Sequence, residues 1–241
     1  QQLPTCGFTP TGWKLRGGYK IWYNRNMSIT RYFENKKIYH IYNRGVAKQN
    51  IFRDINDYQR LLDNFGYYLD GITKKKISEV PKKSLRKILK TKPKKPLVDN
   101  ISFCLMPNHF HLMAKQLQEG GIPQFIRDAL NSYSRYFNTK YERVGPIFQG
   151  RFKAVEVKDD DQLIHLSRYI HLNPFTAGIA DAPENYIWSS FKLFIENQKT
   201  RISNPKLILE IIGSPKKYRE FVQNYAEYTK HLLEIDNLLL E

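Results

Sequence analysis

The sequence has few cysteines and no long apolar run, and each shortage excludes a class of protein. Cys6 and Cys104 are the only cysteines among 241 residues and lie outside any C-x-x-C spacing, so neither a disulfide framework nor a cysteine zinc site is predicted. No apolar run reaches the roughly 18 residues of a membrane span, and the mean hydropathy is −0.57. The N-terminus lacks the apolar stretch of a secretory signal. We therefore expect a cytosolic protein without a membrane partner.

Acidic residues are also scarce relative to basic ones. The chain has 39 Lys and Arg against 23 Asp and Glu, a formal net charge of +16. Clustered basic side chains gain free energy by releasing the counterions condensed on nucleic acids. The balance therefore favours a polyanionic partner, without distinguishing DNA, RNA and a membrane surface. With 41% hydrophobic residues, the composition predicts a packed core.

The ends of the chain and one internal stretch differ from the rest. Residues 1–26 have no clean period, so we expect a poorly ordered leader or cloning remnant, with folding beginning near Met27. Residues 74–95 hold eleven basic residues against one acid and predict an exposed insertion, either a solvated linker or an arm that contacts phosphates. The main domain is predicted over 27–195 and a helical extension over 196–241. The apolar residues of the extension would pack either on the core or on another chain, so they would permit a homodimer.

The order of the expected elements indicates an α+β fold. They are a strand over 37–44, a helix from about 54 to 69, a hairpin of strands 100–106 and 109–115, a helix over 122–139, a strand near 152–157, and a helix that ends where Asn173 meets Pro174. This order is typical of a ferredoxin-like sandwich. We predict a mainly antiparallel sheet with its helices on one face.

The segment His109-Phe110-His111 is a candidate metal site. Successive side chains of a strand point to opposite faces, so the two imidazoles share one face while Phe110 faces the other way. Two such imidazoles can bind one divalent ion. The pattern alone is weak, because an exposed or core-edge pair of histidines has the same spacing.

The expected helix before Pro174 places a tyrosine near this pair. His165, Tyr169 and Asn173 follow one another at intervals of four residues, close to one helix face. Tyrosine has an ordinary pKa of about 10, so its attack on a phosphodiester needs a cation. His109, His111 and Asn173 would supply three ligands for Mg²⁺ or Mn²⁺, with His165 as a further metal or proton partner. The alternative is a core tyrosine with a satisfied hydroxyl.

Five ordered motifs between residues 37 and 191 carry a family resemblance. They are YHIYNRG at 39–45, CLMPNHFHLM at 104–113, GPIFQGRFK at 145–153, YIHLNP at 169–174 and WSSF at 188–191. Together they resemble the REP-associated tyrosine transposases, a branch of the single-strand DNA transposases with an HUH motif. The resemblance implies that His109 and His111 are the metal ligands, Tyr169 the nucleophile, and Asn173 the third ligand, a position that is Gln in many relatives.

The resemblance also implies a reaction and a substrate. Tyr169 would attack a phosphate of single-stranded DNA at or near a hairpin-forming repeat, giving a 5′-phosphotyrosine and a free 3′-hydroxyl, and rejoining would reverse the step. A metal-dependent endonuclease and strand transferase of this kind needs no ATP, and the sequence has no G-x-x-x-x-G-K-[ST] loop. Its place of action would be the bacterial cytosol, with the nucleoid.

Basic and polar residues elsewhere are candidate DNA contacts. These are Asn43, Arg44, Arg135, Arg151, Lys153, Lys82, Lys83 and Arg86. His40 and Tyr133 are interpreted as core residues, whereas Tyr136 could face DNA and is the next candidate nucleophile. His171 is predicted to point away from Tyr169 on the helical wheel.

Two other functions compete with the enzyme. A non-catalytic nucleic-acid-binding protein would keep the fold and the basic surface but would be expected to lose residues from the set of Tyr169, His109 and His111, all of which are present. A structural zinc protein would need a fourth strong ligand, and neither cysteine has the spacing to supply it.

Overall fold

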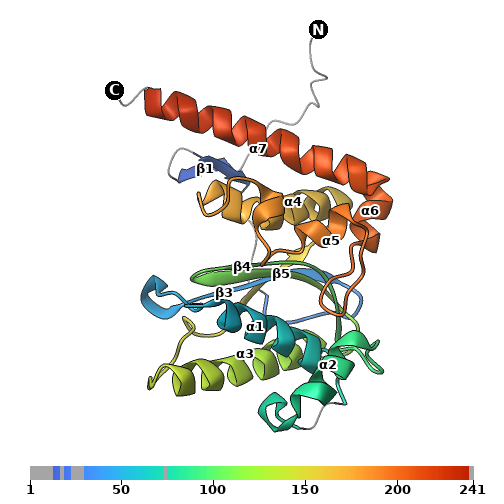
Figure 1. The fold of residues 1–241 in the computed structure, drawn as a ribbon. Coiled ribbons are helices and arrows are strands. Elements are labelled where there is room, and N and C mark those ends of the chain that lie inside the picture. Colours follow the sequence, from blue (N-terminus) through green and yellow to red (C-terminus); the bar gives the residue numbers. More distant parts are fainter. Residues whose placement is uncertain (1–12, 17–18, 23–29, 73–74, 239–241) are drawn as a thin grey trace.

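An antiparallel sheet of four strands lies at the centre of the computed structural model, which describes residues 13–16, 19–22, 30–72 and 75–238 (Figure 1). Its strands are β3 (Ile38–Arg44), β4 (Val98–Met106), β5 (His109–Gln116) and β6 (Lys153–Val157). Their spatial order is β4-β5-β3-β6, and all neighbours pair antiparallel. The predicted hairpin is formed by β4 and β5 around Pro107 and Asn108.

The connections between these strands confirm the ferredoxin-like arrangement. Helix α1 (Ile55–Tyr68) connects β3 to β4, and α3 (Gly121–Lys140) connects β5 to β6. The two helices pack together on one face of the sheet, as predicted (Figure 1). Phe65, Phe125 and Phe110 meet there in a core of buried aromatic and aliphatic side chains.

A buried carboxylate fixes how α1 begins. Asp54 is the N-cap residue and forms a capping box with Asp57, as expected for acids at this end of a helix. Asp57 is fully buried, and it accepts hydrogen bonds from the Lys140 ammonium at 2.7 Å and the Tyr141 hydroxyl at 2.8 Å. These bonds tie the start of α1 to the end of α3.

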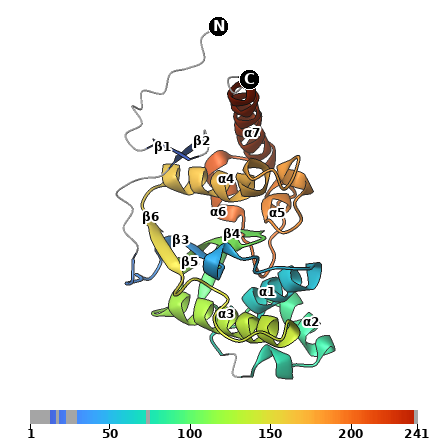
Figure 2. The same cartoon turned by 90° about the vertical axis from the view of Figure 1, so that its left-hand side faces the viewer.

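The second face of the sheet is also covered by helices, which the sequence prediction placed on one face only. The helices there are α4 (Asp160–Thr176), α5 (Phe191–Ile195), α6 (Lys206–Ile212) and α7 (Pro215–Leu238) (Figures 1 and 2). The reason lies in β4, where Phe103 and Leu105 face α1 and α3 while Cys104 and Met106 belong to the opposite core. A sheet that is apolar on both faces needs cover on both.

Helix α4 begins as predicted and ends later than predicted. Asp159 caps it by accepting a hydrogen bond from the Gln162 amide at 2.7 Å. The helix runs through Pro174 to Thr176, whereas the sequence prediction ended it at Asn173. Proline lacks one N–H donor, which removes one bond in the last turn without ending the helix at once. Gly178, with φ +65°, then turns the chain away.

The described parts of the basic insertion and of the predicted leader contribute no strand to the four-stranded sheet. Within 74–95 the structure has a 3₁₀ turn (Ile77–Glu79) and α2 (Lys82–Lys90), which contacts α1. Most of the predicted leader, residues 1–26, lies outside the described residues. Its described parts, β1 (Trp13–Arg16) and β2 (Tyr19–Trp22), pair antiparallel with each other. Two further 3₁₀ turns span Val46–Lys48 and Pro183–Asn185.

The predicted helical extension shares a core with the rest of the chain. Ile208, Tyr218 and Val222 pack in one cluster with Ile170 and Leu172 of α4. The division at residue 196 stays a prediction, but side chains from both sides of it form this second core.

Candidate active site

Histidine and tyrosine side chains gather on the sheet face that α4 covers. His109 and His111 lie on this face of β5, as the alternation predicted, with their ring centroids 5.0 Å apart. On the neighbouring strand β3, Arg44 is paired in register with His109, and Tyr42 with His111. His40 completes the row, with its Nε2 atom 2.9 Å from Nδ1 of His111.

Tyr169 of α4 faces this row of imidazoles. Its ring centroid lies 5.4 Å from that of His111 and 6.3 Å from that of His40, with steep interplanar angles. The next residue, Ile170, is fully buried in the core between α4 and the sheet, whereas Tyr169 is 36% exposed. The helix is therefore anchored by its apolar residues and keeps the tyrosine accessible beside the histidines.

Burial keeps these imidazoles neutral. Desolvation lowers the pKa of His40 to about 3. Burial and, to a lesser extent, the charge of Arg44 lower the pKa of His109 to about 4. The pKa of His111 is held well below its usual value by burial first and by its histidine neighbours second. A neutral imidazole has a free electron pair on one nitrogen, which is the form that binds a metal.

The turn of the hairpin is held by the loop that follows β3. The Gly45 amide donates to the Asn108 carbonyl at 2.8 Å, and the Ile51 amide donates to the Pro107 carbonyl at 2.8 Å. Ala47 and Lys48 adopt φ of 51° and 61°, which is costly for residues other than glycine. The bend lets the Lys48 carbonyl accept from the Asn108 amide group at 3.2 Å. The loop therefore fixes the turn from which His109 begins.

Two of the candidate DNA contacts, Arg44 and Lys153, lie on strands beside this row of histidines, and Arg151 is close to Lys153 in the chain. Arg44 is partly buried next to His109, and among the described residues its buried Nε atom has no hydrogen-bond partner. Lys153 is exposed and paired with Tyr42 across β3 and β6. Arg151 is exposed two residues before it. A buried donor without a partner is costly unless a ligand satisfies it.

The structure does not bring the other candidates to this face. Asn43 is 5% exposed, donates to the Gly150 carbonyl and accepts from the Arg44 amide, so the prediction that it contacts DNA is not supported. Side chains alternate between the two faces along a strand, so Asn43 points to the face opposite to that of its neighbours Tyr42 and Arg44. Arg135 is exposed on α3, across the sheet from Tyr169. The insertion residues Lys82, Lys83 and Arg86 are exposed on α2, beyond α1 (Figure 1).

The two α4 residues that flank Tyr169 occupy different surroundings. Asn173 is partly exposed one turn after Tyr169, and its amide nitrogen donates to the Tyr169 carbonyl at 2.8 Å, which leaves its side-chain oxygen as a candidate ligand. His165 lies against α7, with its ring 5.7 Å from that of Phe221 and its Nδ1 atom 2.8 Å from the Arg168 guanidinium. These contacts do not support the prediction that it partners the metal.

His40 is the residue that sequence analysis missed, since it was interpreted as core. The signal was present in YHIYNR, because alternation along β3 puts His40, Tyr42 and Arg44 on one face and the buried Tyr39 and Ile41 on the other. What the sequence did not contain is the register between β3 and β5. Only that register brings His40 next to His111.

Three other residues that the sequence analysis considered, Tyr133, Tyr136 and His171, lie away from this row of histidines. Tyr133 is fully buried, as predicted. The Tyr136 hydroxyl donates to Asp57 at 3.1 Å on the other side of the sheet, which removes it from the histidines. Its pKa is raised, chiefly by burial, which makes it a poor nucleophile. His171 points away from Tyr169 as predicted and is fully buried between the Tyr218 and Ser190 hydroxyls.

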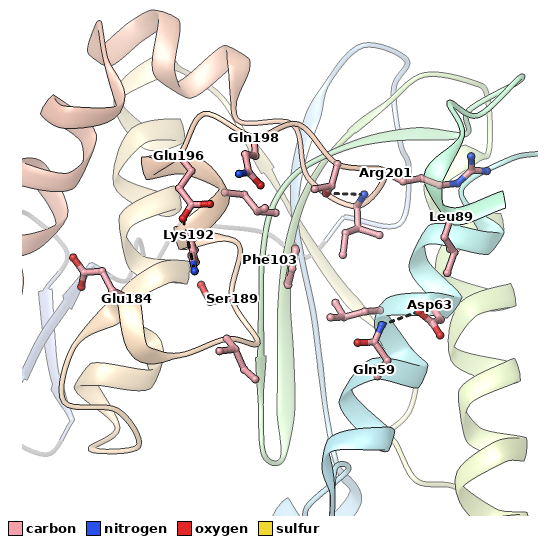
Figure 3. A pocket seen from close by; sticks show the side chains of 15 residues that line it. Gln59, Asp63, Leu89, Phe103, Glu184, Ser189, Lys192, Glu196, Gln198 and Arg201 are labelled. Atoms are coloured by element: carbon pink, nitrogen blue, oxygen red, sulfur yellow. Dashed lines mark hydrogen bonds and ion pairs between the residues drawn. The ribbon is translucent and has the colours of Figure 1, made fainter. Parts of the chain in front are cut away.

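A cavity of about 550 Å³ lies elsewhere, between α1 and the segment 184–202 (Figure 3). Gln59 and Asp63 of α1 line one wall, joined by a hydrogen bond of 2.8 Å, and Lys192 and Glu196 line the other. Among the described residues that line it, none belongs to the row of histidines or to Tyr169.

The described residues contain no cluster of three or more His, Cys, Asp and Glu side chains arranged to hold a metal ion. In the same part of the chain, no helix has both the length and the apolar composition needed to cross a membrane.

Comparisons with known proteins relate part of the chain to transposases. Residues 71–173 match the family model described as "Transposase IS200 like". A Haemophilus influenzae protein that carries the name REP-associated tyrosine transposase is 31% identical over 105 residues, which cover 39% of this chain. The chain spans 58% of the length of that relative.

One solved structure was also found by its likeness in fold. It is described as "Structure of the REP associates tyrosine transposase bound to a REP hairpin" and aligns with a TM-score of 0.47 at 16% sequence identity, over 70% of this chain and 85% of that one. The family match includes His109, His111, Tyr169 and Asn173. Over that stretch, the resemblance to the tyrosine transposases that the motifs predicted is confirmed.

Proposed function

We propose that this protein is a tyrosine transposase that cuts and rejoins single-stranded DNA at or near hairpin-forming repeats. The observation that carries the proposal is the position of Tyr169, whose ring lies 5.4 Å from that of His111 on the sheet face that also presents His109. A nucleophile beside two candidate metal ligands is the arrangement that attack on a phosphodiester needs. The family match over 71–173 supports the same reaction class.

The side chains of this face fit a divalent cation. His109 and His111 are neutral because burial lowers their pKa values. The side-chain nitrogen of Asn173 donates to the Tyr169 carbonyl, so its side-chain oxygen is available as a third ligand. Two imidazoles and an amide oxygen suit Mn²⁺ or Mg²⁺, with open positions for substrate oxygens. Such a cation would favour the phenolate of Tyr169 and neutralise charge on the phosphoryl oxygens.

The proposed reaction balances without a nucleotide cofactor. The Tyr169 hydroxyl oxygen attacks the scissile phosphorus, and the phenolic proton leaves to solvent or to a base. A bond forms between Tyr169 and the 5′ phosphate while the bond from phosphorus to the 3′ oxygen breaks. The 3′ oxygen takes up a proton and departs as a hydroxyl. In the reverse step a 3′-hydroxyl attacks the phosphotyrosine and releases Tyr169.

Charged residues near the histidines would hold the DNA backbone. Arg44 offers a buried Nε donor that has no partner among the described residues, and a phosphate oxygen beside His109 would satisfy it. The exposed Lys153 and Arg151 would extend this contact along the edge formed by β6. The net charge of +16 favours the same partner. With chromosomal DNA as its substrate, the protein would act in the bacterial cytosol.

Covalent adduct formation tests the proposal. The protein is incubated with labelled single-stranded hairpin oligonucleotides and Mn²⁺ or Mg²⁺, and the products are separated on a denaturing gel. We expect a metal-dependent adduct that is lost in Tyr169→Phe and reduced at least about 100-fold in His111→Ala, since both changes remove transition-state interactions. Tyr136→Phe is the matched control, because that hydroxyl lies across the sheet and should not affect the adduct.

Two other outcomes of the adduct assay would contradict the assignment of Tyr169 or the proposed reaction. An adduct that persists in Tyr169→Phe would move the nucleophile to another tyrosine. Tight hairpin binding without any adduct, over a broad pool of hairpins, would favour the non-catalytic nucleic-acid-binding protein.

A further inference from the structure

His40 makes a contact that a packing role does not require. Its Nε2 atom lies 2.9 Å from Nδ1 of His111, and the two rings are stacked with centroids 5.1 Å apart and an interplanar angle of 25°. At this distance one of the two nitrogens carries a hydrogen and the other accepts it. A phenylalanine at position 40 would fill a similar volume and leave the His111 nitrogen without a partner.

The direction of that hydrogen bond decides what His111 can bind. If His111 carries its hydrogen on Nδ1 and donates it to His40, the electron pair on its Nε2 atom is free for a metal. If His40 donates instead, His111 carries its hydrogen on Nε2, and the metal-binding electron pair is lost. Protein ligands of this type commonly donate their second ring N–H to a fixed acceptor, which orients the ring.

His109 also has a hydrogen-bond partner, Asn108, and the direction of that hydrogen bond is fixed. Its Nδ1 atom lies 2.6 Å from the side-chain oxygen of Asn108. The other end of that amide donates to the Lys48 carbonyl at 3.2 Å, which sets the orientation of the amide group. An amide oxygen can only accept, so His109 must carry its hydrogen on Nδ1, with its Nε2 electron pair free.

We propose that His40 and Asn108 are positioning residues that hold His111 and His109 in the tautomer with hydrogen on Nδ1, so that both Nε2 atoms are available to one divalent cation. Neither residue touches the cation or the substrate in this scheme. The inference rests on the proposed function, because it assigns these histidines to the metal of that reaction. It adds two residues that lie outside the H-x-H motif and come from β3 and from the hairpin turn.

Nitrogen NMR of the histidine side chains tests the tautomers without any metal. In the metal-free protein at neutral pH, we expect His111 and His109 to give the signature of hydrogen on Nδ1. In His40→Phe we expect the His111 signals to shift toward hydrogen on Nε2, whereas His40→Gln, which keeps an acceptor oxygen, should restore the original form. A wild-type His111 with hydrogen on Nε2 would overturn the proposal.

Binding of Mn²⁺ alone, measured by calorimetry, gives the second readout. We expect His40→Phe to weaken Mn²⁺ binding roughly 10- to 100-fold, with partial recovery in His40→Gln, in protein that circular dichroism shows to be folded. Unchanged affinity in folded His40→Phe, together with lost affinity in His111→Ala, would overturn the positioning role and leave the proposed function intact. Unchanged affinity in His111→Ala would overturn both.

Discussion

Histidines with the same ordinary pKa serve different purposes in this fold because their neighbours differ. His171 is buried between the Tyr218 and Ser190 hydroxyls, where it joins α4 to α7 and α5. His111 is also buried but lies beside a second imidazole and the ring of Tyr169. Sequence alternation predicted the shared face of His109 and His111. It could not predict His40, because alternation gives the face of a residue and not the register of the neighbouring strand.

Acid is expected to destabilise the metal-free protein through these groups. Burial lowers the pKa of His40 to about 3, of His109 to about 4 and of His171 to about 3, all below the usual value near 6.5. Below pH 6.5 the unfolded chain therefore binds more protons than the folded one, so stability falls as the pH falls. We expect the free energy of unfolding to decrease by at least about 2 kcal/mol between pH 7.5 and pH 5.5.

Urea denaturation in EDTA at several pH values measures this change. His109→Asn removes one of the titrating groups and should flatten the dependence on pH. A free energy of unfolding that stays constant or rises on acidification would mean that these imidazoles take up protons as easily in the folded state as in the unfolded one.

At the scale of elements, local signals predicted where helices begin better than where they lie. The capping residues Asp54 and Asp159 were read correctly as helix starts. The end of α4 was placed too early, because Pro174 is tolerated in the last turn. The prediction that α4 lies on the same face of the sheet as α1 and α3 was also wrong. The face that α4 covers depends on the apolar residues of β4 that face away from α1, among them Cys104 and Met106. The signal was present in β4, whose continuous apolar run indicates a strand that is buried on both faces.

Helix α2 is the element whose role in DNA binding is best tested by charge. Lys82, Lys83 and Arg86 are all exposed, so changing the three to Gln should not affect folding. If α2 contacts the backbone of a hairpin, the triple variant should bind more weakly, and the slope of log affinity against log salt should become shallower by about 1 to 3. Fluorescence anisotropy with a labelled hairpin over a range of salt concentrations measures both quantities.

A second triple variant separates contact from overall charge. Lys192, Lys199 and Lys206 are exposed near α5 and α6, and changing them to Gln removes the same charge. An equal loss of slope in both variants would show that α2 acts only through the net charge of the molecule. An unchanged slope in the α2 variant would make the insertion a linker.

In the molecule as a whole, each face of the sheet packs against its own hydrophobic core. The last part of the chain belongs to the core that contains α4. Tyr218 of α7 is fully buried, and its hydroxyl bonds to His171 at 2.6 Å and to Ser167 at 3.1 Å, both on α4. The sequence predicted a helical extension and a ferredoxin-like order of strands. It did not predict that the extension packs on the helix that carries Tyr169, because the contacts join residues far apart in the chain.

Tyr218→Phe is expected to weaken this connection. The change keeps the ring in the core and leaves the His171 and Ser167 polar groups without their shared partner, which should cost about 1 to 3 kcal/mol of stability. Thermal denaturation measures the loss, and Tyr32→Phe, at a residue that is 76% exposed, is the control. Equal melting temperatures for the two variants would contradict the role of the Tyr218 hydroxyl as a link between α7 and α4.

The alternation of β5 has a consequence for how this protein can evolve. Phe110 and Leu112 fill the core under α1 and α3, while His109 and His111 belong to the face of Tyr169, so each core fixes the other's register. A one-residue insertion or deletion in the Pro107–Asn108 turn would exchange the two sets of side chains. This hairpin can therefore change only by substitution if both the fold and the shared face of the two histidines are to survive.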